Sequence, residues 1–323
     1  MIQRQVGSSL SLSRIVLGTA GYGTGFQDDA AFAQMDRYFE SGGRTLDTAR
    51  VYGMWAPDGD GASKKCVGKW LRARGVRNQV VISTKGAHHD LHDIRHKRVT
   101  PACIRQDLDE SLDFLGVDTV DLYFLHRDDP RIPVSEIMDV LHEQVSAGKI
   151  RVLGASNWSV SRIAEANAYA ARSGKTPFYV SQIEWSAAKL ERQIYDSEDS
   201  TQFMNDENFA WYSTLDFPVM AYSSQAKGLF SKLIQAPDRI TGVFAETYAT
   251  PVNRKRAVKI AELAGKYGVS LGRMALAVLL CNPLRPCAII GASNMSQLED
   301  SLAAASISLS TDELSSVLDG TSF

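Results

Sequence analysis

Cysteine is scarce in this sequence of 323 residues, and long apolar runs and an excess of charge of either sign are missing. The four cysteines form no C-x-x-C pair and are too few for a disulfide framework, so we expect free thiols in a reducing cytoplasm. No apolar run approaches the roughly 20 residues of a membrane-spanning helix. The first ten residues lack a charged segment followed by an apolar one, so a secretory signal is not expected.

Charge is nearly balanced, with 35 Lys and Arg against 37 Asp and Glu. This balance gives no electrostatic reason to expect nucleic acid or a membrane as a partner. The hydrophobic fraction of 44% is typical of a folded chain, and no linker or low-complexity segment interrupts it. We therefore expect one domain over residues 1–323; the sequence leaves the number of subunits open.

What the sequence does have is an alternation of short apolar segments with amphipathic segments of roughly 12 to 16 residues, a usual helix length. The apolar segments lack strict alternation, as expected of parallel strands covered on both faces. Eight strands, each followed by a helix, predict an α/β fold, a (β/α)8 TIM barrel, with an open doubly wound sheet as the structural alternative. The expected strands are Arg14–Leu17, Arg44–Asp47, Gln79–Thr84, Thr119–Leu125, Val152–Ala155, Phe178–Ile183, Val219–Ser223 and Cys287–Ile290.

Capping signals place several helices. Thr100-Pro101 begins one that ends at Gly116. Met1–Ser13 is expected to form an N-terminal hairpin that closes the barrel bottom, and Thr311–Phe323 an appended C-terminal helix. Further helices are expected at Pro133–Ala147, Ser159–Arg172, Asn253–Tyr267 and Ser270–Cys281. Surplus length falls in the loops Gly53–Ala62, Gly86–Val99, Ser186–Phe203 and Ser224–Pro251, which follow strands and belong on the catalytic face of a barrel.

Polar residues stand at the ends of the expected strands, where packing alone does not explain them. In a barrel these ends converge on one mouth. The residues are Asp47, Lys85, His126, Ser156, Asn157, Gln182, Tyr222 and Ser223.

Asp47, Tyr52 and Lys85 together predict a general acid. A phenol has an ordinary pKa of about 10 and is a poor acid at neutral pH. A nearby ammonium lowers that pKa, and a carboxylate beside the ammonium keeps it charged and in place. His126 could then orient a carbonyl oxygen beside the tyrosine.

These residues lie within segments that resemble the aldo-keto reductase superfamily in order and separation across nearly the whole chain. The segments are Asp47–Gly53, Ser83–Lys85, Leu122–His126, Gly154–Asn157, Gln182, Ala221–Ser223 and Ile290–Gln297. The resemblance implies NAD(P)H-dependent reduction of an aldehyde or ketone to an alcohol. Tyr52 would be the general acid with its pKa lowered by Lys85, Asp47 would pair with Lys85, and His126 would position the substrate oxygen.

The resemblance also implies a cofactor site along the mouth, with Ser156, Asn157 and Gln182 on the nicotinamide carboxamide and Tyr222 stacked on its ring. The full set is Gly18, Thr19, Asp47, Ser156, Asn157, Gln182, Tyr222, Ser223, Gln225, Gly228, Leu229, Gly291, Ser293, Gln297, Asp300 and Ser301. NADP is expected from the habit of the family. NAD is the alternative, because Gly291–Ser301 contains no basic residue to hold a 2′-phosphate.

Substrate contacts are expected from Tyr22, Trp55, His126 and Trp158, each near a strand end. Aromatic faces beside the polar loop Asp58-Gly59-Asp60 would suit a sugar-like carbonyl, and this substrate class is a hypothesis.

Other interpretations remain at this stage. Gly18–Gly25 imitates a Rossmann turn, although its spacing is not G-x-G-x-x-G. His88, His92 and His96 could share a helical face as zinc ligands, but a solvated loop without metal is the expectation. A metal-dependent barrel hydrolase, and a slow or non-catalytic redox-sensing subunit that binds nicotinamide on the same barrel, are the alternative functions.

Overall fold

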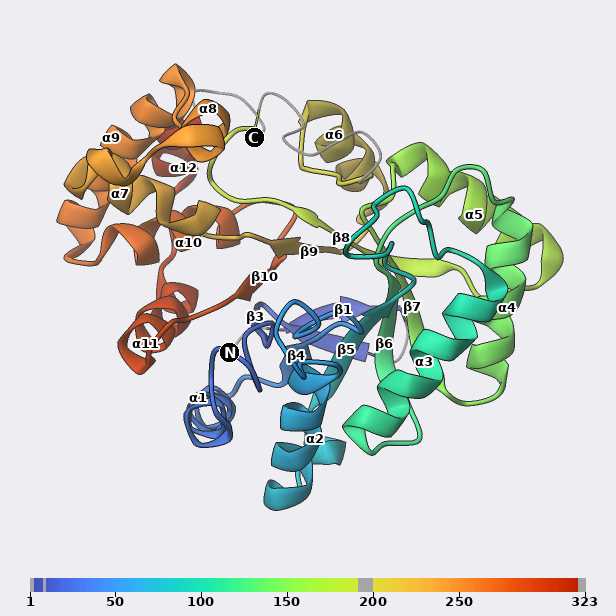
Figure 1. Cartoon of the computed structure of the whole chain (residues 1–323). Coiled ribbons are helices and arrows are strands. Elements are labelled where there is room, and N and C mark those ends of the chain that lie inside the picture. The colour runs from blue at the N-terminus through green and yellow to red at the C-terminus, as the bar shows by residue number, and fades with distance from the viewer. Residues whose placement is uncertain (1–2, 8–9, 191–199, 319–323) are drawn as a thin grey trace.

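The computed structural model describes residues 3–7, 10–190 and 200–318, and eight parallel strands close into a barrel (Figure 1). Closure excludes the open doubly wound sheet and confirms the predicted (β/α)8 fold. The strands pair in the order β10-β3-β4-β5-β6-β7-β8-β9. Their bounds are β3 Ile15–Gly18, β4 Thr45–Asp47, β5 Val81–Gly86, β6 Val120–Leu125, β7 Ile150–Ser156, β8 Phe178–Glu184, β9 Val219–Tyr222 and β10 Cys287–Ile290.

Helices surround the strands, and α7, α8, α9 and α12 gather on one side (Figure 1). Side-chain caps begin several of them, such as Thr100 before α3 and Ser159 before α5. The helices are α1 Asp28–Glu40, α2 Ala62–Arg74, α3 Pro101–Leu115, α4 Val134–Ser146, α5 Val160–Ser173, α6 Asp206–Leu215, α7 Leu229–Gln235, α8 Gly242–Tyr248, α9 Pro251–Tyr267, α10 Leu271–Leu280, α11 Met295–Ala303 and α12 Thr311–Leu318. The appended helix is therefore α12, and residues 319–323 of the predicted range lie outside the described residues.

The N-terminal strands β1 Gln3–Val6 and β2 Leu10–Ser13 form the expected antiparallel hairpin. Val6, Leu10 and Leu12 pack in one apolar cluster with side chains of the barrel interior such as Leu122 and Met220. The hairpin thus closes the end of the barrel opposite the residues that follow the strands.

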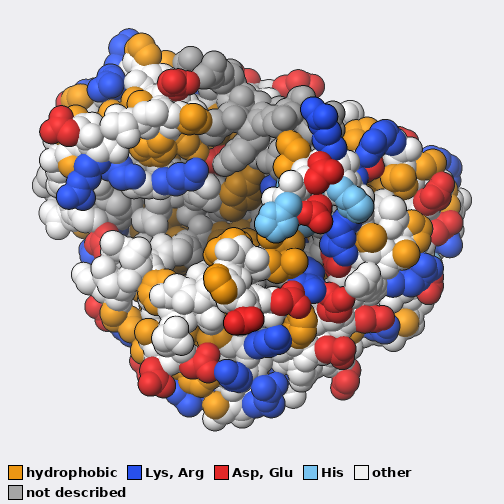
Figure 2. Space-filling model, in the orientation of Figure 1, with side chains coloured by type: hydrophobic (Ala, Val, Ile, Leu, Met, Phe, Trp, Pro, Cys, Tyr) orange, Lys and Arg blue, Asp and Glu red, His pale blue; other side chains and the backbone are white. Residues whose placement is uncertain are grey.

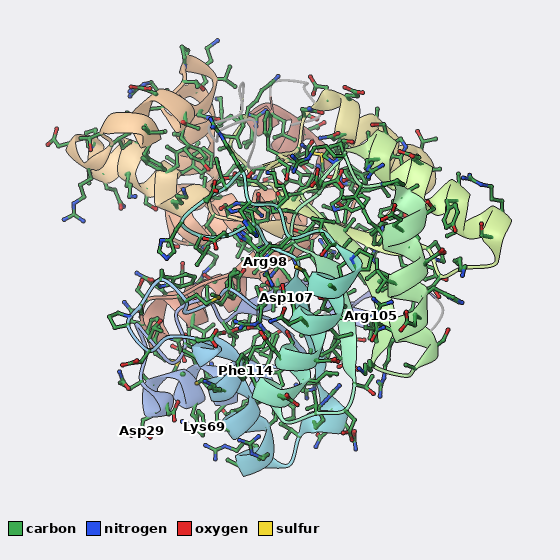
Figure 3. All side chains as sticks on the ribbon, turned by 45° about the vertical axis from the view of Figure 1, so that its right-hand side comes forward. Asp29, Lys69, Arg98, Arg105, Asp107 and Phe114 are labelled. Atoms are coloured by element: carbon green, nitrogen blue, oxygen red, sulfur yellow. The ribbon has the colours of Figure 1, made fainter. Side chains whose placement is uncertain are left out.

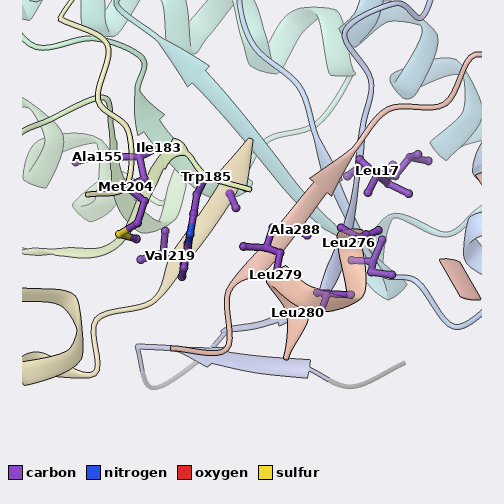
Figure 4. Close-up of a cluster of buried hydrophobic side chains, with 14 of the residues drawn as sticks. Leu17, Ala155, Ile183, Trp185, Met204, Val219, Leu276, Leu279, Leu280 and Ala288 are labelled. Atoms are coloured by element: carbon purple, nitrogen blue, oxygen red, sulfur yellow. The ribbon is translucent and has the colours of Figure 1, made fainter. Parts of the chain in front are cut away.

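A larger apolar layer lies between the barrel and its helices. In Figure 4, Leu276, Leu279 and Leu280 of α10 lie beside Ala288 of β10. Trp185, just after β8, is buried in this same layer and lies near Met204 in the close-up. This packing fixes the strand ends that carry the polar residues.

The surplus loop Ser224–Pro251 holds two helices that the sequence analysis did not assign, α7 and α8, and the unassigned helix α6 follows the loop Ser186–Phe203. Residues 191–199 of the expected Ser186–Phe203 loop lie outside the described part of the chain. Among the described helices, none alone is long and apolar enough to cross a membrane; α9 and α10 meet that length and composition only as a pair bent by 102°.

Candidate active site

The strand ends place the predicted polar residues around one mouth. Asp47 stands beside Gly18 on one neighbouring strand and beside Ser83 on the other. Further around the barrel, Ser156 at the end of β7 is paired with Gln182 of β8. Because all eight strands run in the same direction, side chains at their carboxyl ends face a common opening.

Lys85 links Asp47 to Tyr52 at this opening. Its Nζ donates to Asp47 Oδ2 at 2.6 Å, to the Thr48 carbonyl at 3.0 Å and to the Tyr52 hydroxyl at 3.2 Å. The three N–H donors of the ammonium are therefore all used. Asp47 Oδ1 accepts from Ser83 at 2.8 Å and from Gln182 at 3.1 Å, so the carboxylate is fixed as well.

The electrostatics of this group differ from the expectation in one respect. Burial lowers the pKa of the Lys85 ammonium, but Asp47 and Tyr52 outweigh burial, so its pKa is raised and the charge is retained. Burial raises the pKa of the Tyr52 phenol, and the Lys85 ammonium offsets only part of that increase. The sequence analysis considered the ammonium and missed burial, which cannot be read from local spacing.

His126 ends up beside the tyrosine, with ring centroids 6.2 Å apart. Burial holds the pKa of His126 well below 6.5, and the neighbouring His88 lowers it further. A neutral imidazole at this place can donate one hydrogen bond to a carbonyl oxygen without adding charge.

A cavity of about 830 Å³ begins at Tyr52 and extends over the mouth. Figure 2 shows the surface hollowed here, with histidine, acidic and basic side chains gathered beside the hollow. Eleven of the predicted site residues line it, and they are Gly18, Tyr22, Tyr52, Ser223, Gln225, Gly228, Gly291, Ser293, Gln297, Asp300 and Ser301.

Other predicted cofactor residues lie outside that lining, where they are buried or hydrogen-bonded. Thr19 is buried and its hydroxyl donates to the Asp47 carbonyl. Asn157 has a left-handed backbone with φ of 59° and accepts from the Tyr222 hydroxyl at 2.8 Å. Ser156 accepts from the Asn157 amide at 3.2 Å, and Leu229 is buried at the start of α7.

The loop-lined part of the cavity contains residues that the sequence analysis missed. Lys227 and Lys232 line it, as do Ser270 and Gly272 at the start of α10. For Lys227 and Lys232, the one signal in the sequence was that Ser224–Pro251 is surplus length after a strand. Asp300 is paired with Arg273 at 2.8 Å, so a cation from another helix stands beside the segment that has none of its own.

The predicted substrate residues separate into exposed and buried ones. Trp55 is 58% exposed and its ring lies 6.2 Å from that of Tyr52. Tyr22 is buried at the cavity wall and its hydroxyl donates to Gln34. Trp158 is also buried, and its indole donates to the Arg127 carbonyl at 3.1 Å, so it supports the mouth from below.

The histidine-rich loop is not helical. His88 is buried next to His126, whereas His92 and His96 are exposed. The helical face considered for zinc does not form. In the described ranges, no group of three or more His, Cys, Asp or Glu residues is arranged to hold a metal ion.

Comparison with known proteins agrees with this geometry. The closed barrel, with polar side chains gathered at the carboxyl ends of its strands, defines an enzyme of the (β/α)8 class. Residues 14–319 match the model of the Aldo/keto reductase family, and the chain belongs to that family.

Curated relatives are distant but cover most of the chain. An uncharacterized oxidoreductase, YrpG, of Bacillus subtilis is 27% identical over 95% of this chain and 91% of its own length. The norsolorinic acid reductase stcV of Emericella nidulans is 27% identical over 97% of this chain and 79% of its own. An NADP(+) aryl-alcohol dehydrogenase of Phanerodontia chrysosporium is 31% identical over 58% of this chain and 52% of its own.

Proposed function

We propose that this protein uses NADPH to reduce an aldehyde or ketone to an alcohol, with Tyr52 as the proton donor. The observation that carries the proposal is the bond of Lys85 Nζ to both Asp47 and the Tyr52 hydroxyl, at a tyrosine that lines the cavity. Tyr52 accepts from Lys85, so its own O–H is directed to another acceptor. A substrate carbonyl oxygen in the cavity is such an acceptor.

Each residue has a defined part in the proton transfer. Tyr52 gives its proton to the carbonyl oxygen as negative charge develops there. The Lys85 ammonium stabilises the phenolate that remains, and Asp47 keeps the ammonium charged and in place. Neutral His126 donates a hydrogen bond to the same carbonyl oxygen and orients it toward Tyr52.

The lining suits a dinucleotide. The cavity volume of about 830 Å³ is within the range of cofactor sites. The hydroxyl of Ser223, the amides at the start of α10 and the ammonium groups of Lys227 and Lys232 are donors for phosphate groups. When bound, a nicotinamide nucleotide supplies the hydride.

NADPH is proposed over NADH because cations reach the cavity from outside Gly291–Ser301. Arg273 pairs with Asp300, and Lys227 and Lys232 line the wall. Two relatives are named for NADP(+), the aryl-alcohol dehydrogenase and an aldo-keto reductase of Schizosaccharomyces pombe.

Aromatic aldehydes are proposed as better substrates than sugars. The sugar hypothesis relied on aromatic faces beside the polar loop Asp58-Gly59-Asp60, and in that loop the Asp60 carboxylate is paired with Arg50 at 2.6 Å. Apolar Met54 and Trp55 remain 41% and 58% exposed beside Tyr52. A panel of aryl aldehydes, short aliphatic aldehydes and aldoses tests this ranking, and higher kcat/KM for aldoses would restore the sugar hypothesis.

The function itself is tested by carbonyl-dependent oxidation of NADPH and of NADH, with the dissociation constant of each nucleotide measured separately. Steady turnover with NADPH, and weaker binding of NADH, is expected. Tight nicotinamide binding with almost no turnover would favour the redox-sensing subunit instead. Hydrolysis that depends on added metal, without nucleotide oxidation, would favour the hydrolase.

A further inference from the structure

A buried histidine outside the four-residue constellation lies directly against His126. The ring centroids of His88 and His126 are 4.6 Å apart, and the two rings meet edge to face at 72°. His89 continues the contact, with its ring centroid 4.1 Å from that of His88. Three imidazoles, those of His89, His88 and His126, are thus packed one against the next.

The loop that carries His88 is fastened at both ends by one carboxylate. Asp107 of α3 accepts from the Ala87 amide at 2.8 Å and is paired with Arg98 at 2.6 Å. Figure 3 shows Arg98 and Asp107 side by side. Because these two bonds bracket residues 87–98, the position of His88 is set by the scaffold.

Hydrogen bonding also fixes the tautomer of His88. Its Nδ1 lies 2.9 Å from the His89 carbonyl oxygen, which can only accept, so Nδ1 carries a proton. His89 makes the same kind of bond to the Asp90 carbonyl at 2.7 Å. Each of the two rings is therefore held in one orientation.

His126 depends on this support. Its Nδ1 is buried and has no hydrogen-bond partner among the described residues. A protonated imidazole would bury an unpaired N–H at that atom, which is costly. The ring is therefore held by packing on that side, and Nε2 is the nitrogen that remains for a carbonyl oxygen.

We propose that His88 is a positioning residue, which holds the His126 ring in orientation and in its neutral form. This inference rests on the role of His126 under the proposed function. The other groups around His126 do not replace His88. Tyr52 is the other ring in contact with His126, but its centroid is farther away, at 6.2 Å, and it is itself the proposed proton donor. The ionisable groups around His126 are His88, Arg127, Lys85, Lys64 and Tyr52.

Two substitutions at His88 separate the packing of its ring from the role of its ring nitrogens. His88→Ala removes the ring, so we expect about a tenfold loss of kcat/KM for the carbonyl through misorientation, with the NADPH dissociation constant unchanged. His88→Phe retains a ring, and we expect it to recover most of that loss. His96→Ala, at an exposed histidine of the same loop, is the matched control and should behave as the wild type.

A second readout does not require turnover. The NMR signal of the His126 ring, assigned with His126→Gln, should not titrate in the wild type between about pH 5 and pH 8, the range of ordinary histidines. His88→Ala opens the buried side of the ring, so a titration should enter this range from the acid side, whereas His88→Phe keeps the ring covered and should behave as the wild type. If the proposed function failed while this shift appeared, the positioning role would stand by itself.

The proposal would be overturned if His88→Ala lowered only the melting temperature, leaving kcat/KM and the His126 titration as in the wild type. A loss of kcat/KM in the well-folded His88→Phe variant as large as that in His88→Ala would also overturn it.

Discussion

The two parts of the cavity are built in different ways. In the strand-end part, the residues behind the lining are Asp47, Lys85 and Ser83, which stand on adjacent barrel strands and are buried. Ser83 and Lys85 both donate to the Asp47 carboxylate. In the loop-lined part, Lys227 is exposed and Lys232 is half-buried, and both come from the long segment between β9 and α9. The residues of the first part are held by the barrel strands, whereas those of the second part are carried by a loop segment.

This difference separates two kinds of function. Proton transfer needs groups held at fixed distances, and the barrel supplies them. The choice between NADPH and NADH depends on charged residues at the cavity wall. Loops can carry such residues, because their sequence can change without disturbing the barrel. We therefore expect substitutions in the strand-end part to affect stability and turnover together, and those in the loop-lined part to affect affinity alone.

The largest effect is expected at Lys85. Lys85→Met removes the ammonium and leaves the buried Asp47 carboxylate unpaired, which should cost about 3–5 kcal/mol of unfolding free energy. Turnover should fall by about 10²–10⁴-fold, the usual range for lost acid catalysis. Urea unfolding and steady-state kinetics measure the two losses.

The double variant Asp47→Asn/Lys85→Met is the control for that result. Removing both charges should restore much of the stability while turnover remains lost. If Lys85→Met kept wild-type turnover, the strand-end part would not be the catalytic part.

A pH-dependent stability effect is expected next in size, at Asp128 in the loop after β6. Burial raises the pKa of its carboxyl to about 6, although Arg162 opposes that increase. Between about pH 4 and pH 6 the folded state keeps a proton on Asp128 that the unfolded state releases. The free energy of unfolding of the protein therefore falls as the pH rises through this window. Asp128→Asn should become more stable than the wild type across that window, by about 2–3 kcal/mol at its upper end. Urea unfolding at several pH values measures the difference, and a constant difference would contradict the burial argument.

The smallest effect is expected in the loop-lined part. Replacing Lys227 and Lys232 together by Ala should weaken NADPH binding by about three- to tenfold, since exposed charges contribute modestly. Turnover at saturating NADPH and the melting temperature should not change. Lys255→Ala, an exposed lysine of α9 away from the cavity lining, serves as the matched variant. A large loss of turnover would erase the distinction between the two parts.

The contrast between the strand-end part and the loop-lined part also explains which features could be predicted from the sequence. All eight barrel strands and the Asp47, Lys85 and Tyr52 contact were predicted, because buried strands and their polar ends leave strong local signals. The approach of Arg273 to Asp300 was not, since it joins two helices 27 positions apart through tertiary packing. The raised pKa of Tyr52 and the burial of Trp158 were missed for the same reason: both depend on what covers the side chain.

The central claim is that Tyr52 delivers the proton, and Tyr52→Phe tests it most directly. Phe keeps the ring and removes only the hydroxyl, so the NADPH dissociation constant should stay near the wild-type value. We predict that kcat for carbonyl reduction falls by at least about 10²-fold in this variant. Wild-type turnover by Tyr52→Phe, with NADPH still bound normally, would contradict the account.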